Sequence, residues 1–468
     1  MQDYPQHLFI SYLLSTFSNP SFDWPSHYLV DLKADPYNLF YYVTKFFSLF
    51  FDIETSGKLF ISSYIALVVL LVIKSSRSCG KDQAPPWGLL LLFPFSFSQI
   101  YFLGFTNYLI SVPLLFLALL DLDRFVDSPL SITSFLRQLF YQLLLFVTHP
   151  FTVALFIGFG LAGSLFHLPD RTKFMKAFSP PVLLALFFFV WFLGSYEPMA
   201  SGQATAWGLR WWPGEITLGF YMLMFTGMTW TNGVHWPATL IWGAIVSIFL
   251  VNWIRRRKTT AFPAKTATFF LLSLLGFAIM PFSFTYYQFF NARMALISYF
   301  FLAFAFSRIT LGRGGAALIV GLAALLMVLS AQLQGNLSGE TEEVMPLFAK
   351  MERNAAILPL MLDSSAGELD PVLFDEFHVH EPSYYHIFVG GGVNPDLFPN
   401  PLLPVQYKPG LELPVPTDLS PASLPPIASH YRYLLVRGAP PMYLRDLAHY
   451  YHFVGQSGAW SLFGSPIL

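Results

Sequence analysis

Long apolar runs with almost no charge inside them limit most strongly how this chain can fold. A helix of about 20 apolar residues matches the hydrocarbon thickness of a bilayer. The sequence contains ten runs of nearly that length, some short enough to be tilted or interfacial. They lie at 57–74, 88–104, 106–121, 132–148, 150–167, 178–195, 237–254, 266–285, 294–311 and 314–333. The pattern predicts an all-α polytopic membrane protein with about ten transmembrane helices.

The composition excludes an ordinary soluble domain. Of 468 residues, 55% are hydrophobic and 11% are charged, whereas about 25% of residues in soluble domains are charged. A bilayer can accept this apolar surface, which a soluble protein could not bury. The net charge of −1 gives no reason to expect a nucleic-acid partner. The single cysteine, Cys79, rules out an intramolecular disulfide.

Basic residues predict the orientation, because loops on the cytoplasmic side of a membrane are enriched in Lys and Arg. Their clusters follow every second predicted boundary, at 74–81, 124–137, 171–176, 255–265 and 308–313. The opposite loops, 196–236 and 286–293, contain only Arg210 and Arg293. The amino-terminal segment and the carboxyl-terminal part are therefore predicted to be extracytoplasmic.

Three regions follow from this orientation. Residues 1–56 form an extracytoplasmic first loop with interfacial helices, 57–333 the transmembrane domain, and 334–468 a small extracytoplasmic α/β domain. An outer first segment with nothing ahead of it to carry it across is unusual. We expect a first membrane helix to be missing ahead of residue 1; the alternative is that a short tail crosses by itself.

Local patterns refine this outline. Apolar residues at near-helical spacing predict an interfacial helix within 37–51, and the 132–167 stretch is interpreted as a hairpin broken at 148–150, with one kinked helix as the alternative. The carboxyl-terminal part changes to a proline- and acid-rich composition. Strands are expected at 355–362 and 431–436, helices at 341–354 and 442–451, and two short β-runs around Ser457-Gly458.

The amino-terminal segment repeats one short pattern. Asp3-Tyr4-Pro5-Gln6-His7 and Asp23-Trp24-Pro25-Ser26-His27 share the order Asp, aromatic, Pro, any residue, His. Two copies are too few for a repeat architecture. Because proline just after an acid also marks helix starts, the two stretches are either a functional pair or two helix N-caps.

The predicted spans offer little chemistry of their own. Pumps and proton-coupled transporters usually place ionisable side chains inside the bilayer. Here His149, beside Pro150, is the one candidate, and we interpret it as a packing residue. Polar residues instead gather in the outer loops, which therefore hold the predicted site. They are Asp3, His7, Asp23, His27, Glu197, Arg210, Glu215, His235, Asn291 and Arg293.

Two chemical roles match such an outer site. A carboxylate can deprotonate an acceptor hydroxyl, and an arginine can neutralise a leaving phosphate. Asp3 is the predicted catalytic base, and Arg293 and Arg210 are the predicted phosphate-binding residues, with ordinary snorkelling as the alternative. The supporting polar residues are predicted to be His7, Asp23, His27 and Glu197.

Several stretches resemble those of GT-C-fold membrane glycosyltransferases and of bacterial membrane proteins that carry an Asp-x-Pro-x-His stretch after their first helix. They are 3–7, Gly104-Phe105-Thr106-Asn107-Tyr108, Thr148-His149-Pro150, Asn291-Ala292-Arg293 and the ending 455–463. The resemblance covers most of the chain through its architecture and these short motifs. It implies that Asp3 is the catalytic acid and that the donor is a polyprenyl-phosphate-linked sugar. Asp23, twenty residues later, is the nearest acid in the sequence that could assist it.

We therefore expect a glycosyltransferase at the outer face of a bacterial cytoplasmic membrane that transfers a sugar to an envelope lipid, glycan or protein. A divalent metal ion is a possible cofactor, although no ligand cluster demands one. The first alternative is a non-enzymatic scaffold for envelope polysaccharide assembly. The second is a transporter of a neutral substrate.

Overall fold

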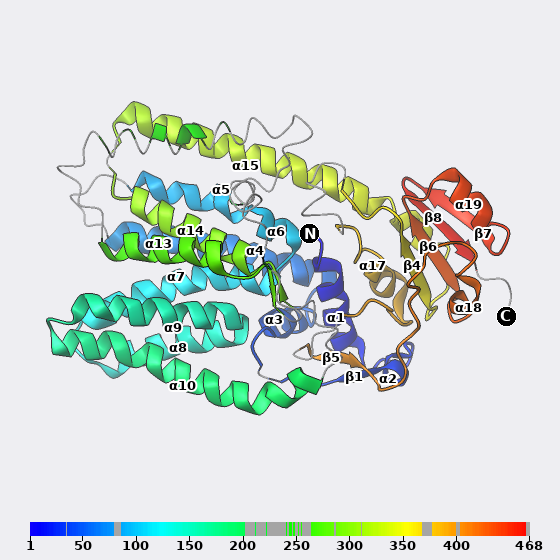
Figure 1. Ribbon diagram of the computed structural model, residues 1–468, viewed down its shortest axis with the longest axis horizontal. Coiled ribbons are helices and arrows are strands. Elements are labelled where there is room, and N and C mark those ends of the chain that lie inside the picture. The colour runs from blue at the N-terminus through cyan, green and yellow to red at the C-terminus, as the bar shows by residue number, and fades with distance from the viewer. Residues whose placement is uncertain are drawn as a thin grey trace.

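The computed structural model describes most of the chain. It covers residues 1–33, 35–78, 86–201, 264–284, 287–309, 311–366, 377–398 and 403–464, with a few positions and short stretches between 211 and 254. The helices of the body lie side by side along the long axis of the molecule, and a small sheet lies at one end (Figure 1). The amino-terminal helices lie between these two parts.

Four helices in the described residues are long and apolar enough to cross a membrane, which supports a membrane protein. They are Ile53–Arg77, Pro150–His167, Arg171–Gly194 and Arg313–Phe348. Shorter apolar helices occupy Trp87–Leu103, Ile132–Thr148, Ala264–Ile279 and Phe290–Phe306. The number of ten spans remains a prediction, and the run at 237–254 lies largely outside the described residues.

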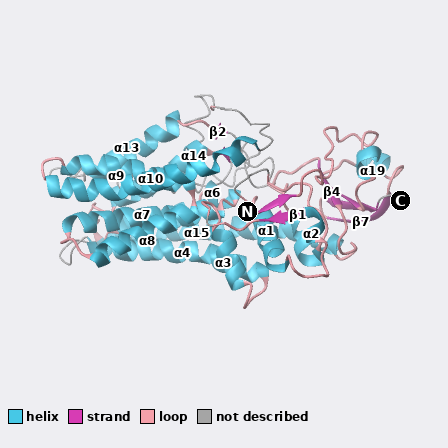
Figure 2. Ribbon diagram, turned by 90° about the horizontal axis from the view of Figure 1, so that it is seen from below, coloured by secondary structure: helices cyan, strands magenta, loops and turns pink. Residues whose placement is uncertain are grey.

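The helical body is built around α7 (Thr106–Asp127), which is buried along most of its length. The other helices that build the body are α4 (Ile53–Ser78), η1 (Trp87–Leu91), α5 (Leu92–Ser96), α6 (Gln99–Leu103), α8 (Ile132–Thr148), α9 (Pro150–Ser164), η2 (Leu165–His167), α10 (Arg171–Ser201), α13 (Ala264–Ile279) and α14 (Phe290–Phe306). Figure 2 shows the same parallel arrangement from below.

Two predicted spans differ from the observed elements. The run at 88–104 is interrupted at Phe97 and Ser98, shortly after Pro94, and it ends at the left-handed Gly104. The run at 266–285 ends as a helix at Ile279 and continues into a short hairpin of β2 (Ser283–Phe284) and β3 (Tyr287–Gln288). The membrane-length pattern of apolar residues therefore overestimated how regular these segments are.

His149 separates α8 from α9 with an extended backbone, φ −161° and ψ 125°. Its Nδ1 accepts a hydrogen bond from the Phe151 amide at 3.1 Å, which caps the new helix. The two helices also pack against one another. The hairpin interpretation of 132–167 therefore agrees with the structure, and His149 lies at its tip.

The amino-terminal segment folds over the end of the body at which that tip lies. Its elements are α1 (Tyr4–Thr16), α2 (Trp24–His27), β1 (Tyr28–Val30) and α3 (Leu39–Phe47). Asp3 and Asp23 occupy the N-cap positions of α1 and α2, each followed by a proline in the first turn, without a side-chain cap bond. The repeated motif therefore does mark two helix starts, as the N-cap alternative predicted.

A four-stranded sheet forms the core of the carboxyl-terminal part, in the order β4-β6-β8-β7. Its first pair is parallel and the other two pairs are antiparallel. The strands are β4 (Ile357–Met361), β6 (Tyr433–Arg437), β7 (His452–Ser457) and β8 (Trp460–Gly464). All four agree with the predicted strands. The helices near the sheet are α16 (Met345–Phe348), α17 (Ser383–Tyr385), η3 (His386–Gly390), α18 (Pro425–Ala428) and α19 (Pro441–Leu447).

A long helix and a strand pair both join this part to the rest of the molecule. Helix α15 (Arg313–Glu342) runs from the helical body toward the sheet (Figure 1). Strand β5 (Val405–Tyr407) pairs antiparallel with β1 from the amino-terminal segment. The carboxyl-terminal part is thereby fixed over the same end of the body as α1 and α3.

Candidate functional site

The stretch Gly104-Phe105-Thr106-Asn107-Tyr108 organises the site, because it lies where α6 ends and α7 begins. The Asp3 amide donates to the Leu103 carbonyl at 3.1 Å. Gly104 has a φ of +81°, and a Cβ added there would lie 2.9 Å from the Asp3 nitrogen. Only glycine permits both this backbone conformation and this close approach. The contact places Asp3 directly at the end of the body.

Asn107 fixes the other part of the amino-terminal segment to the same place. Its Oδ1 accepts from the Phe40 amide at 2.9 Å, and its Nδ2 donates to the Tyr37 carbonyl at 2.6 Å. Asn107 is fully buried, so these bonds satisfy a polar group that would otherwise be costly. Together they hold the start of α3 over α7.

Arg293 lies in the first turn of α14, with only 4% of its surface exposed. Its guanidinium carbon lies 4.8 Å from the ring centre of Phe105, 5.5 Å from that of Tyr108 and 5.6 Å from that of Phe290. Such rings attract a cation electrostatically. The three rings surround the Arg293 guanidinium. Its planar set of N–H donors is of the kind that binds two phosphate oxygens at once.

His149 packs next to Arg293. Its Nε2 lies 3.5 Å from Arg293 Nη1, and its ring centre lies 5.3 Å from those of Tyr37 and Tyr108. The Tyr108 hydroxyl also donates to the Arg293 carbonyl at 2.6 Å. A buried packing residue, as predicted, agrees with these contacts, and the contact with Arg293 is one that sequence spacing could not show.

His7 lies on the other side of Tyr37 and is 1% exposed. Its Nδ1 lies 2.7 Å from the Tyr41 hydroxyl, and its ring centre lies 5.9 Å from that of Tyr37. Its Nε2 is buried and has no hydrogen-bond partner among the residues that the structure describes. Burial, assisted by the nearby His380, lowers the pKa of His7 to about 3, so the ring is neutral near pH 7.

Asp3 lies next to His380, a residue more than 370 positions away in the chain. Asp3 Oδ1 is 3.7 Å from His380 Nε2, and the two side chains are 16% and 14% exposed. Burial lowers the pKa of His380 to about 4, so this histidine is also neutral near pH 7. It can therefore orient the carboxylate without neutralising it.

A buried polar network anchors the segment that carries His380. His378 is fully buried, with Nε2 3.0 Å from Glu340 Oε2 in α15 and Nδ1 2.8 Å from Glu381 Oε1. Arg437 in β6 lies 3.6 Å from the same Glu340 carboxylate. These contacts tie residues 377–398 to the long helix and to the sheet, which determines where His380 meets Asp3.

The other predicted site residues lie elsewhere. Asp23 accepts from the Gly392 amide at 3.0 Å and lies 3.1 Å from His27 Nε2, so this pair supports the Gly390–Gly392 turn. Neither has a contact with Asp3 in the described residues. Glu197 belongs to α10, but its side chain is outside the description, and Arg210 lies outside the described residues.

Residues near the site that the sequence did not suggest include Tyr37, Tyr41, His380, Asp396 and Phe398. Burial raises the pKa of the Asp396 side chain to about 6. The backbone carbonyl of Asp396 accepts a hydrogen bond from the side-chain amide of Gln6. Segment 377–398 reaches the site only through the tertiary fold. The two histidines of His378-Val379-His380 are the one local signal that could have drawn attention to it.

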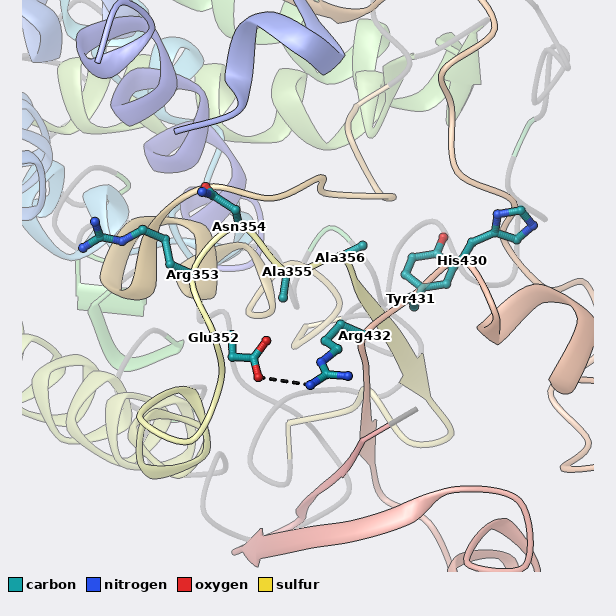
Figure 3. A pocket seen from close by; sticks show the side chains of 8 residues that line it. All are labelled: Glu352, Arg353, Asn354, Ala355, Ala356, His430, Tyr431 and Arg432. Atoms are coloured by element: carbon teal, nitrogen blue, oxygen red, sulfur yellow. Dashed lines mark hydrogen bonds and ion pairs between the residues drawn. The ribbon is translucent and has the colours of Figure 1, made fainter. Parts of the chain in front are cut away.

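The described residues contain no group of three or more His, Cys, Asp or Glu side chains arranged to hold a metal ion. A separate hollow of about 350 Å³ opens in the carboxyl-terminal part, where the chain enters β4 and β6. Figure 3 shows Glu352 and Arg432 facing each other across it, 3.1 Å apart, while Arg353 points away. Glu352 and Arg432 are thus paired on the surface, and Asp3 and Arg293 do not line the hollow.

The chain matches no known family model, no curated protein and no solved structure. The function must therefore be argued from the site itself.

Proposed function

We propose that the chain is a membrane glycosyltransferase of GT-C type that moves a sugar from a polyprenyl-phosphate carrier to an envelope lipid, glycan or protein acceptor. One observation carries the proposal: a continuous series of ring contacts connects Asp3 with Arg293 at one end of the helical body. It runs from His380 through Phe398, His7, Tyr37 and His149. In this proposal, the candidate base and the candidate phosphate ligand act in one site, with Asp3 beside His380 and Arg293 beside His149.

The chemistry assigns one role to each end of this series. The Asp3 carboxylate takes the proton of the acceptor hydroxyl, whose oxygen forms the new bond to the anomeric carbon of the sugar. The bond from that carbon to the phosphate oxygen breaks, and its electron pair leaves with the polyprenyl phosphate. Arg293 stabilises the negative charge that develops on this leaving group. His380 orients Asp3, and His149 orients Arg293.

The charges at the opposite end of the body support an extracytoplasmic position for the site. Lys173 pairs with Asp127 at 2.7 Å, and Arg137 and Lys265 pair with Asp121 and Asp123. These cations belong to the clusters that the positive-inside rule places in the cytoplasm. The end with Asp3 and Arg293 then faces outward, where lipid-linked sugars donate to envelope acceptors.

The test is transfer by membranes that contain the full-length protein. Polyprenyl-phosphate-linked radiolabelled glucose, mannose and arabinose are supplied, and label is followed into lipid, polysaccharide and protein fractions. Asp3→Asn should reduce the rate by about 10²- to 10⁴-fold, because it removes the general base. The matched control is Asp31→Asn, which removes an exposed acid of the same segment. Equal rates in both variants would exclude Asp3 from catalysis. No transfer by the wild type would favour a non-enzymatic scaffold.

A metal requirement is tested in the same assay by adding EDTA to the wild-type membranes. Loss of transfer that Mg²⁺ or Mn²⁺ restores would show that a divalent ion takes part. Unchanged transfer would show that the side chains act without one.

A further inference from the structure

Basic side chains from three helices meet at the end of the body that the positive-inside rule places in the cytoplasm. Arg137 of α8 forms an ion pair with the buried Asp121 of α7. Arg124 of α7 donates through Nη2 to the Lys74 carbonyl of α4 at 3.3 Å, and Lys74 Nζ donates to the Tyr141 hydroxyl of α8 at 2.8 Å. All three cations attract the Asp121 carboxylate. Lys74, Arg124 and Arg137 therefore form one basic cluster across α4, α7 and α8.

Positive charge exceeds negative charge in the segments that carry the basic cluster. Residues 74–82 and 121–137 together contain five basic residues and four acids. Two of these acids, Asp123 and Asp127, form ion pairs with lysines of α13 and α10. Five basic residues are thus left with two acids, Asp82 and Asp121. Such an excess of one sign of charge attracts an anionic ligand.

Exposed apolar side chains surround the basic cluster on α8 and α4. Leu136 directly precedes Arg137, Phe140 follows it one turn later, and both are more than half exposed. Ile73, which directly precedes Lys74 in α4, is also exposed. Because α4 is long and apolar enough to cross a membrane, side chains of this kind face lipid. The Arg137 side chain, which is 44% exposed, therefore lies at a level where lipid surrounds the protein.

We propose that the basic cluster binds the phosphate of an anionic phospholipid, whose acyl chains pack against the exposed apolar side chains of α4 and α8. Lysine and arginine bind phosphate oxygens through charge-assisted hydrogen bonds. Basic pockets between membrane helices at the cytoplasmic side recognise lipid headgroups in this way. A soluble phosphate would contact the cations alone, whereas a lipid contacts both the cations and the apolar side chains. The inference goes beyond the proposed function, because Asp3 and Arg293 lie at the other end of the body.

Native mass spectrometry of the full-length protein, released from detergent micelles, tests this lipid site. The probes are phosphatidylglycerol and phosphatidylethanolamine with identical acyl chains, and inorganic phosphate serves as a soluble competitor. Phosphatidylglycerol should bind about tenfold more tightly than the zwitterionic lipid, and millimolar inorganic phosphate should not displace it. Equal affinities for the two lipids would overturn the proposal. Displacement by inorganic phosphate would also overturn it, because the cluster would then be a site for a soluble anion.

A pair of matched variants locates the bound lipid. Arg124→Gln removes a cation of the basic cluster, whereas Arg171→Gln removes an exposed arginine from the start of α10 at the same end of the body. Arg124→Gln should bind phosphatidylglycerol about fivefold more weakly, as expected for the loss of one cation near a membrane surface, and Arg171→Gln should bind it like the wild type. Equal affinities in the two variants would overturn the site. If Arg124→Gln does not fold, Lys74→Gln takes its place with the same expectation.

Discussion

The two ends of the helical body differ in how exposed their charged side chains are and in what surrounds them. At one end, Lys173 and Asp127 form a surface pair in which the side chains are 43% and 67% exposed. At the other end, the Arg293 guanidinium is buried among aromatic rings, and two buried histidines are held neutral. Exposed pairs contribute at most about 1 kcal/mol each, whereas buried charges are expensive to maintain. The opposite end also contains a buried carboxylate, Asp121, but it is paired with Arg137, whereas Arg293 is surrounded by rings.

Removing one cation from each end tests most strongly whether the two ends differ in function. Arg293→Gln should lower glycosyl transfer by about 10²- to 10³-fold, because the leaving phosphate loses its charge partner. Lys173→Gln should leave transfer unchanged and lower stability by at most about 1 kcal/mol. Transfer rates with polyprenyl-phosphate sugars, together with thermal unfolding of both variants, provide the measurement. Similar losses of transfer in the two variants would show that the ends are not functionally distinct.

A smaller effect concerns pH. Burial holds the pKa of His380 near 4, below its ordinary value of 6.5. The unfolded chain therefore binds a proton that the folded chain does not, so stability is complete above pH 6.5 and falls as the pH decreases toward 4. The expected slope is about 1.4 kcal/mol per pH unit for each such histidine. His7, with a pKa near 3, adds to it.

Comparison with a variant isolates this effect. Burial raises the pKa of Asp396 to about 6, so this carboxyl group stabilises the folded chain as the pH decreases, opposite to the histidines. The pH dependence of the wild type alone therefore does not isolate the contribution of His380. His380→Gln should lower the pH dependence of the unfolding temperature between pH 6.5 and 4, while His430→Gln, at an exposed position, should leave it unchanged. Identical slopes in the wild type and His380→Gln would contradict a neutral buried His380.

The sequence predicted those parts of the site that depend on local pattern. The stretch around Gly104 contacts Asp3, and Phe105 and His149 contact Arg293, so both residues lie at the same end of the body, while their roles remain predictions. The carboxyl-terminal strands were also predictable, because short apolar runs between turn residues indicate strands.

The remaining parts depend on contacts between distant segments. His380 and Phe398 lie beside Asp3 and His7 in a segment that is held by tertiary contacts, among them the anchoring of His378 to Glu340 and the pairing of β1 with the nearby β5. Neither contact has a periodic signature in the sequence. Asp23 was grouped with Asp3 because the two share a motif, yet it holds the Gly390–Gly392 turn instead. A repeated motif that caps two helices predicts two local structures and not their proximity.

The position of the two ends relative to the membrane is the central claim, and thiol labelling tests it most directly. In a Cys79→Ser background, Ser18→Cys places a thiol in the exposed loop after α1, and Thr172→Cys places one beside the Lys173–Asp127 pair. Intact cells are treated with a membrane-impermeant maleimide, and lysed cells serve as the reference. We predict that Ser18→Cys is labelled in intact cells and that Thr172→Cys is labelled only after lysis. The reverse pattern would place Asp3 and Arg293 in the cytoplasm and contradict the account.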